Sequence, residues 1–288
     1  MLAHCYRMLG SLHDAEDALQ EALLGAWKGF AGFEGRSSAR TWLYRVCTNA
    51  CLRQAGKQRV LTLAEPLDQT ADLGEPVLEP LWLEPWPDDP AARYEQRESI
   101  ELAFVAALQR LPGTQRAVLV MREVLQFSAA ETADLLDTTV ASVNSALQRA
   151  RKTLGAPARP QRADVGDLAA RFAAAWEAAD VPALLDLLTG DATFTMPPLP
   201  AWFRGREMVG RFLAERVFET RWRLSPVRLN GQPAFACWSD GTRAAAMVLD
   251  VRDGRVAAIT AFLDPALLDR LGIPEGPMSS GARAALPR

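Results

Sequence analysis

An acidic, proline-rich stretch between residues 61 and 90 constrains this chain most, because neither a helix nor a sheet can run through it. It contains six prolines and eight aspartates or glutamates but no lysine or arginine. Proline lacks the backbone N–H that helices and strand ladders use, and like charges oppose compaction. The sequence therefore predicts an extended linker over residues 61–92, with separate folded units on either side.

The segments that flank the linker have helical periodicity. Apolar residues such as Ala18 and Ala22 recur at helical spacing up to about residue 60, and the same spacing returns beyond the linker. The turn-like sequence "LPGTQR" and a short break at Asp137 interrupt the second segment. We expect two all-α units, over residues 1–60 and 93–156.

A different pattern follows the proline-containing joint "GAPARPQR". Two helical segments precede the short strand "ATFTM" and a further helix, and four strand-like runs come after them. The turn signals "NGQ", "SDG" and "RDG" separate these runs. Helices followed by a meander of strands predict an α+β domain over residues 165–275, with a flexible tail at 276–288.

Composition narrows the class of protein. The formal net charge of −3 excludes a uniformly basic nucleic-acid coat, so any DNA contact must come from local patches. The absence of a secretory signal and of a long apolar run predicts a cytoplasmic protein without a membrane segment. Cys47 and Cys51 are four residues apart, but no matching Cys/His pair follows, so we favour buried thiols over zinc ligands for them and for Cys5 and Cys237. No metal or cofactor is expected.

The segment "SAAETADLLDTTVASVNSALQRARKTL" has the layout of a helix-turn-helix. Ser128 and Glu131 form a capping-box pattern, and Thr139 can cap the second helix. Helical spacing places Val140, Val143, Ala146 and Leu147 inward. It leaves a polar and basic set outward: Ser142, Asn144, Ser145, Gln148, Arg149, Arg151 and Lys152. These residues suit base edges and phosphates, although an ordinary helical hairpin with a solvated face would look the same.

The longer segment "LQRLPGTQRAVLVMREVLQFSAAETADLLDTTVASVNSALQRARKTL" resembles region 4 of the sigma-70 family. The resemblance covers the segment almost continuously. It implies that the second helix reads the minus-35 promoter element in the major groove, with Ser142, Asn144, Ser145, Gln148 and Arg149 facing bases. Arg122, Arg151 and Lys152 are then the candidates for phosphate contacts.

Near the N-terminus, Asp14, Asp17, Gln20 and Glu21 fall on one helix face and make it acidic. Such a face is usually only solvated. However, the surrounding segment "HDAEDALQEALLGAWKGFAGFEGRSSARTWLYRVCTNACLRQ" resembles region 2 of the same family. In that family a matching face docks on the largest subunit of RNA polymerase, which implies polymerase binding by Asp17, Gln20 and Glu21. Region 2 normally begins with a longer first helix, whereas this sequence enters it partway.

The same resemblance implies a minus-10 site in the loop "FEGRSSAR" and the helix after it. A flexible polar loop can hold an extruded base, and a ring with nearby cations can hold a melted strand. The candidate residues are Arg36, Ser37, Ser38, Arg40, Trp42, Arg45 and Asn49. For Trp42, plain core packing is an equal alternative.

The third unit resembles the SnoaL-like, nuclear-transport-factor-like cone, in which helices cover a curved sheet. "FLDPALLDRLGIP" looks like the C-terminal signature of sigma factors with this extension. Seven aromatic residues can either line a pocket for a small apolar ligand or fill the cone: Trp176, Phe194, Trp202, Trp222, Phe235, Trp238 and Phe262. The domain has no histidine, and Asp240 and Asp264 are its only candidate acids, so we do not expect an enzyme.

These resemblances predict a bacterial sigma factor of the extracytoplasmic-function (ECF) type, with two all-α sigma domains and an α+β cone domain. Its expected partners are the core RNA polymerase and promoter DNA, without a membrane. The cone would modulate activity in cis by contacting the sigma units or the linker. By resemblance, the linker runs through the polymerase toward the RNA exit path, where its acidic charge mimics nucleic acid. The alternatives are a ligand-responsive repressor, or an enzyme tethered to DNA.

Overall fold

The computed structural model describes residues 1–32, 35, 37–55, 66–77, 83–87, 101–154 and 165–277. These residues form two compact units, each with its own core. The first comprises 1–55, 83–84 and 101–154, and the second comprises 66–77, 85–87 and 165–277. The tail beyond residue 277 lies outside the described residues.

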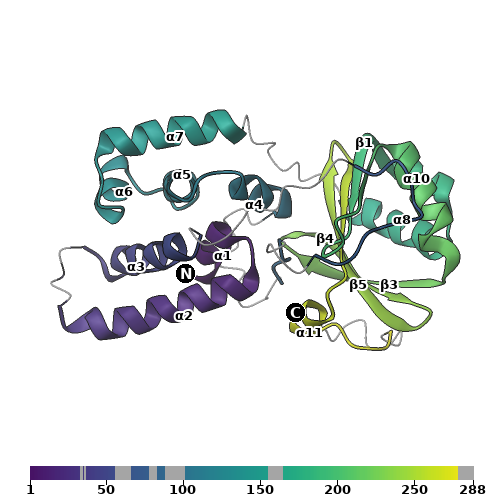
Figure 1. Cartoon of the computed structure of the whole chain (residues 1–288), viewed down its shortest axis with the longest axis horizontal. Coiled ribbons are helices and arrows are strands. Elements are labelled where there is room, and N and C mark those ends of the chain that lie inside the picture. Colours follow the sequence, from purple (N-terminus) through teal and green to yellow (C-terminus); the bar gives the residue numbers. More distant parts are fainter. Residues whose placement is uncertain are drawn as a thin grey trace. The chain divides into compact units, whose positions relative to one another are not determined.

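The first unit is helical, as the periodicity predicts (Figure 1). Its α-helices are α1 (Leu2–Leu9), α2 (Leu12–Gly29), α3 (Ala39–Ala55), α4 (Leu102–Gln109), α5 (Gly113–Leu119), α6 (Ala129–Leu135) and α7 (Val140–Leu154). A 3-10 turn at Phe30–Gly32 follows α2, and a π turn at Val120–Val124 follows α5. Helices α6 and α7 form the predicted helix-turn-helix.

The two helical regions meet in a shared hydrophobic cluster, to which α3 contributes Tyr44. Tyr44 of α3 is buried in the cluster that α4 to α7 build, and its ring meets that of Phe127 edge-on at 5.5 Å between centroids. Arg116 of α5 donates a hydrogen bond to the backbone carbonyl of Met8 in α1. A ring and a guanidinium group therefore join segments that are far apart in sequence.

The second unit is the expected α+β domain. Its elements are α8 (Val165–Glu177), α9 (Val181–Leu187), β1 (Leu188–Thr195), β2 (Trp202–Arg204), α10 (Arg206–Glu215), β3 (Trp222–Leu229), β4 (Gln232–Ser239), β5 (Thr242–Arg252), β6 (Arg255–Phe262) and α11 (Pro265–Arg270). The strands form one sheet in the order β2-β1-β6-β5-β4-β3. Only β1 and β6 are parallel, and β3 to β6 form the predicted meander. The short strand β2 was not predicted from the sequence.

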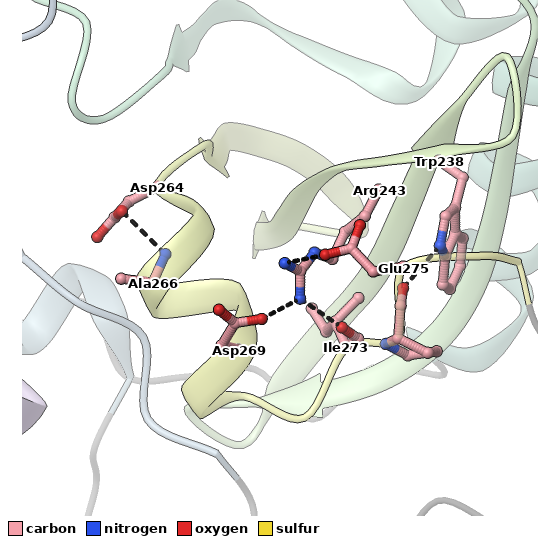
Figure 2. Close-up of polar contacts among 8 residues, drawn as sticks. Trp238, Arg243, Asp264, Ala266, Asp269, Ile273 and Glu275 are labelled. Atoms are coloured by element: carbon pink, nitrogen blue, oxygen red, sulfur yellow. Dashed lines mark hydrogen bonds and ion pairs between the residues drawn. The ribbon is translucent and has the colours of Figure 1, made fainter.

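The segment after β6 is fixed to the sheet (Figure 2). Arg243 of β5 donates to the carboxylates of Asp269 and Glu275, at 2.6 and 2.8 Å, and its side chain is only 7% exposed. The indole N–H of Trp238 donates to the carbonyl of Pro274 at 3.0 Å. A buried cation with two carboxylate partners holds a segment more firmly than an exposed pair would.

Candidate nucleic-acid and polymerase interfaces

The helix-turn-helix has the caps that its sequence predicts. The Oγ of Ser128 accepts the backbone N–H of Glu131 at 3.1 Å, and the Glu131 carboxylate accepts the Ser128 N–H at 2.7 Å. Thr139 Oγ1 accepts the N–H of Ser142 at 3.1 Å and so begins α7. These local bonds satisfy backbone donors that a helix leaves open at its N-terminus, which is why the pattern is readable from sequence.

Helix α7 presents the predicted polar face. Val143, Ala146 and Leu147 are buried, whereas Val140 is 44% exposed, so its predicted inward position is wrong. Val140 is the first residue of α7, where helical side chains lean toward the N-terminus and past the packed turn. The seven predicted outward residues are all exposed: Ser142, Asn144, Ser145, Gln148, Arg149, Arg151 and Lys152.

Two of the candidate phosphate contacts have partners in the protein. Arg151 pairs with Glu123 at 2.6 Å between Nε and Oε1, and both side chains remain at least one-third exposed. Arg122 is half-buried and donates to the carbonyl of Phe127, before α6. Arg151 can exchange its partner for a phosphate at little cost, because exposed ion pairs are weak.

The candidate minus-10 residues lie at the start of α3 and along it. Arg36 lies outside the described residues. Ser37, Ser38 and Arg40 are exposed, and the Ser38 hydroxyl caps α3 by accepting the N–H of Thr41 at 3.0 Å. A serine that is occupied as a cap has less freedom to bind a base.

Farther along α3 the candidates are half-buried. Trp42 lies 6.5 Å from the ring of Phe30, centroid to centroid, so part of its ring is used in packing. The Nη2 atom of Arg45 lies 2.6 and 2.7 Å from the two carboxylate oxygens of Asp137, in the turn between α6 and α7. The structure thus brings a minus-10 candidate against the helix-turn-helix.

The acidic face of α2 is smaller than the sequence indicated. Asp17, Gln20 and Glu21 are exposed, and Glu21 pairs with Arg53 at 2.7 Å. Asp14 is only 7% exposed and accepts the Gln54 side chain at 2.9 Å. Burial raises the pKa of the Asp14 carboxyl above its ordinary value. Its predicted place on the outer face is therefore wrong.

Sequence reasoning missed an apolar surface on the second half of α2 and just beyond it. Four large side chains are exposed there: Leu23 by 49%, Leu24 by 58%, Trp27 by 85% and Phe30 by 65%. The signal was present, because "LLGAWKGF" has more apolar residues than one buried helix face can hold. Exposed apolar residues that gather beside an acidic face are typical of a protein-binding surface.

The seven aromatic candidates of the cone divide between two environments. Trp176, Phe194 and Phe235 belong to the core on the helix-covered face of the sheet, and Trp222 packs against it. Ring centroids there are 6.2 Å apart for Trp176–Phe194 and 6.1 Å for Trp176–Trp222, so these rings pack against one another. The other three lie outside this core cluster: Trp202, Trp238 and Phe262.

The two candidate acids hold turns. Asp240 accepts the N–H of Arg221 at 3.0 Å, and Asp264 accepts the N–H of Ala266 at 3.1 Å, which caps α11 (Figure 2). Among the described residues, no group of three or more histidines, cysteines or carboxylates could hold a metal ion. No described helix is both long and apolar enough to cross a membrane.

Parts of the acidic linker are bound to the second unit. Leu67 donates its N–H to the carbonyl of Trp202 at 2.9 Å, beside the edge strand β2. Trp86 and Asn230 exchange two hydrogen bonds of 2.8 Å: the Trp86 N–H to the Asn230 side-chain oxygen, and the Asn230 N–H to the Trp86 carbonyl. Trp86 is only 8% exposed. A charged, proline-rich sequence predicts none of these contacts.

Described linker residues 83 and 84 belong to the first unit, and Glu84 makes most of the contacts. The Glu84 N–H donates to the carbonyl of Gly10 at 3.0 Å, and the Glu84 carbonyl accepts the Tyr6 hydroxyl at 2.7 Å. The Glu84 carboxylate accepts the Ser11 hydroxyl at 3.1 Å and the N–H of His13 at 3.0 Å. The linker is therefore ordered at the N-terminus of α2 as well.

Comparison with known proteins agrees with this architecture. Residues 1–60 match sigma-70 region 2, residues 101–154 match sigma-70 region 4, and residues 169–259 match the SnoaL-like domain. The ECF RNA polymerase sigma factor SigG of Mycobacterium tuberculosis is 43% identical, over 96% of this chain and 81% of SigG. SigJ of the same organism is 29% identical, over 92% of this chain and 88% of SigJ. The crystal structure of SigJ superposes with a TM-score of 0.67, at 25% identity, and covers 95% of this chain and 96% of SigJ. The chain belongs to the ECF RNA polymerase sigma factors, and it carries a SnoaL-like domain after region 4.

Proposed function

We propose that the SnoaL-like domain controls this sigma factor in cis by holding the linker between regions 2 and 4. The observation that carries the proposal is the pair of hydrogen bonds between Trp86 and Asn230, together with the burial of Trp86. A linker bound in this way cannot also thread through the polymerase. Release of the linker would then be the step that permits full activity.

The contacts of the linker depend on the backbone conformation of Asn230 and on a buried linker residue, Thr70. Asn230 has a positive φ of 57° at the turn between β3 and β4, which directs its side-chain oxygen and its own N–H toward the same residue. Thr70 is 5% exposed, and its hydroxyl donates to the carboxylate of Glu215. The two bonds between Trp86 and Asn230 are neutral and contribute roughly 0.5–1.5 kcal/mol each, so they can hold the linker reversibly.

The remaining roles are assigned to exposed and half-buried side chains of the first unit. The face of α7 would read the minus-35 element, and Trp42, Arg45 and Asn49 of α3 would act at the minus-10 element. Asp17, Gln20 and Glu21 would bind the core polymerase, extended by the exposed apolar residues from Leu23 to Phe30. Charge and hydrogen-bond donors on α7, and apolar area on α2, support this division.

We assign no catalysis to the SnoaL-like domain, because its two candidate acids are used as turn caps. Binding of a small apolar ligand by the SnoaL-like domain is a second candidate function. It is favoured by the indole N–H of Trp176, which is buried without a hydrogen-bond partner among the described residues. A polar atom of such a ligand would satisfy that donor. Quenching of tryptophan fluorescence by added apolar ligands, and its absence in Trp176→Phe, tests this idea.

The test of cis control is run-off transcription with core polymerase and Asn230→Gly. Glycine accepts the positive φ at this turn and removes the oxygen that binds Trp86. We expect transcription to rise several-fold. The matched control is Asp253→Gly, an exposed residue with a φ of 53° in the turn between β5 and β6. Equal output from both variants and the unaltered protein would overturn the proposal, as would unchanged output after deletion of the chain beyond residue 162.

A further inference from the structure

Val140 is an apolar side chain in a polar setting. It is 44% exposed at the first position of α7, and it is one of five large hydrophobic residues exposed in the part of the chain that the structure describes. The other four form the apolar surface around α2. A β-branched residue gains little in an exposed helix, because its side chain loses rotamer freedom there. Burial in the protein therefore does not explain a valine here.

The surroundings of Val140 point to DNA. Thr139 caps the helix at the preceding position, and Ser142, Asn144 and Ser145 are exposed in the next turns. In a helix-turn-helix, the N-terminal residues of the second helix are those that contact base edges. Val140 is thus continuous with the polar face that we assign to the minus-35 element.

The major groove offers one apolar group that varies with sequence. Thymine presents its C5-methyl group there, and cytosine, adenine and guanine present only hydrogen-bonding edges and C–H groups. The isopropyl group of valine has no donor or acceptor, so it can exclude water from a methyl group but cannot satisfy a polar edge. The chemistry that complements an exposed valine in this groove is a thymine methyl group.

We propose that Val140 is a specificity-determining residue that packs against the C5-methyl group of a thymine in the minus-35 element. This inference rests on the proposed assignment of α7 to that element. It adds an apolar contact to a surface whose other candidates recognise hydrogen-bonding edges or phosphates. Promoters with thymine at the contacted position are then preferred over promoters with any other base there.

The experiment replaces each thymine of the minus-35 region by deoxyuridine, one at a time, in a promoter that the holoenzyme transcribes. Deoxyuridine lacks only the methyl group, so base pairing is retained. Loss of one buried methyl group, about 0.8 kcal/mol, corresponds to a decrease of about fourfold in affinity. For the unaltered holoenzyme, we expect replacement of one particular thymine by deoxyuridine to lower affinity in this way. For the Val140→Ala holoenzyme, the same replacement should not change affinity.

Val181→Ala is the matched control, because Val181 is also the first residue of a helix after a cap, in the second unit. It should keep the full deoxyuridine effect. Val140→Ser removes both methyl groups, and serine is well tolerated at the start of a helix, so this variant should fold and lose the effect. An effect that persists in Val140→Ala, or that appears at no thymine, overturns the proposal.

A third set of variants separates this proposal from the one on which it rests. If Gln148→Ala and Arg149→Ala also leave recognition of the minus-35 element unchanged, the assignment of α7 has failed. If both variants weaken it while no deoxyuridine does, only the role of Val140 is overturned.

Discussion

Helices α7 and α3 carry the two sets of candidate DNA contacts. They differ in whether the candidate side chains are exposed or are engaged within the protein. On α7 every predicted base-facing residue is exposed. On α3, Arg45 is bound to Asp137, Ser38 caps the helix and Trp42 packs near Phe30. The proposed minus-35 surface is thus preformed, whereas the proposed minus-10 residues must first exchange partners.

The bond between Arg45 and Asp137 also limits what this arrangement can bind. Elements named minus-35 and minus-10 are centred about 25 base pairs apart, which is about 85 Å of duplex at 3.4 Å per pair. Within the first unit, the Nη2 atom of Arg45 on α3 lies 2.6 Å from a carboxylate oxygen of Asp137 in the turn before α7. Under the proposed assignments, α3 and α7 must therefore separate before both elements can be bound at once.

The largest effect is expected for Tyr44→Ala, which removes the ring that α3 contributes to the shared core. Truncation of a large buried aromatic side chain costs about 3–5 kcal/mol. Denaturant unfolding should show this loss. Trp27→Ala, at an 85% exposed position on α2, is the control and should change stability little. Equal stability of the two variants would contradict the shared core.

A smaller effect is expected for Gln148→Ala or Arg149→Ala on α7. Loss of one good base contact costs on the order of 1–3 kcal/mol and relaxes the preference at that position. Competition binding with single-base variants of the minus-35 element measures both effects. Asp167→Ala, on the exposed side of α8, serves as the control. Uniform weakening across all sequences would identify a phosphate contact instead.

Acid should weaken the packing of α3 on α1 through His4. Burial lowers the pKa of His4 from 6.5 to about 3. Below about pH 6.5 the unfolded chain therefore binds a proton at His4, whereas the folded chain binds it only below about pH 3. The contribution of His4 to the free energy of unfolding is complete above this window and decreases as the pH falls through it. At pH 5.5 the loss is about 1.4 kcal/mol. His4→Gln cannot titrate, and its unfolding free energy should lack this component between pH 7 and 5.5.

The smallest effect is expected for Asp137→Asn, which removes the charge that holds Arg45 and leaves one side-chain oxygen as an acceptor. Asparagine tolerates the positive φ of 49° at this residue, so the turn should be preserved. Exposed ion pairs contribute about 0.2–1 kcal/mol, which limits the gain in affinity of the free protein for single-stranded minus-10 DNA to a few-fold. Asp134→Asn makes the same charge change on α6 as the control. An equal gain in both variants would indicate a general charge effect and not release of Arg45.

Much of the local structure was predictable. The capping box at Ser128, the cap at Thr139 and the meander from β3 to β6 depend on residues close in sequence. The errors occurred where tertiary packing decided burial. Asp14 lies inward because Gln54 of α3 packs over it, and Val140 lies outward because none of the described elements buries the start of α7. The division of the aromatic candidates between two environments required the sheet itself.

The sequence by itself determined the order of the units, their helical or mixed character and the family, because periodicity, caps and motifs are properties of short segments. Only the tertiary structure decided that Tyr44 completes the core around the helix-turn-helix, that Arg45 is bound by Asp137 and that the linker is held at Asn230. Arg45 is 92 residues from its partner, and Trp86 is 144 residues from Asn230. Such contacts depend on which surfaces fit when the chain is compact, and no local pattern records that fit.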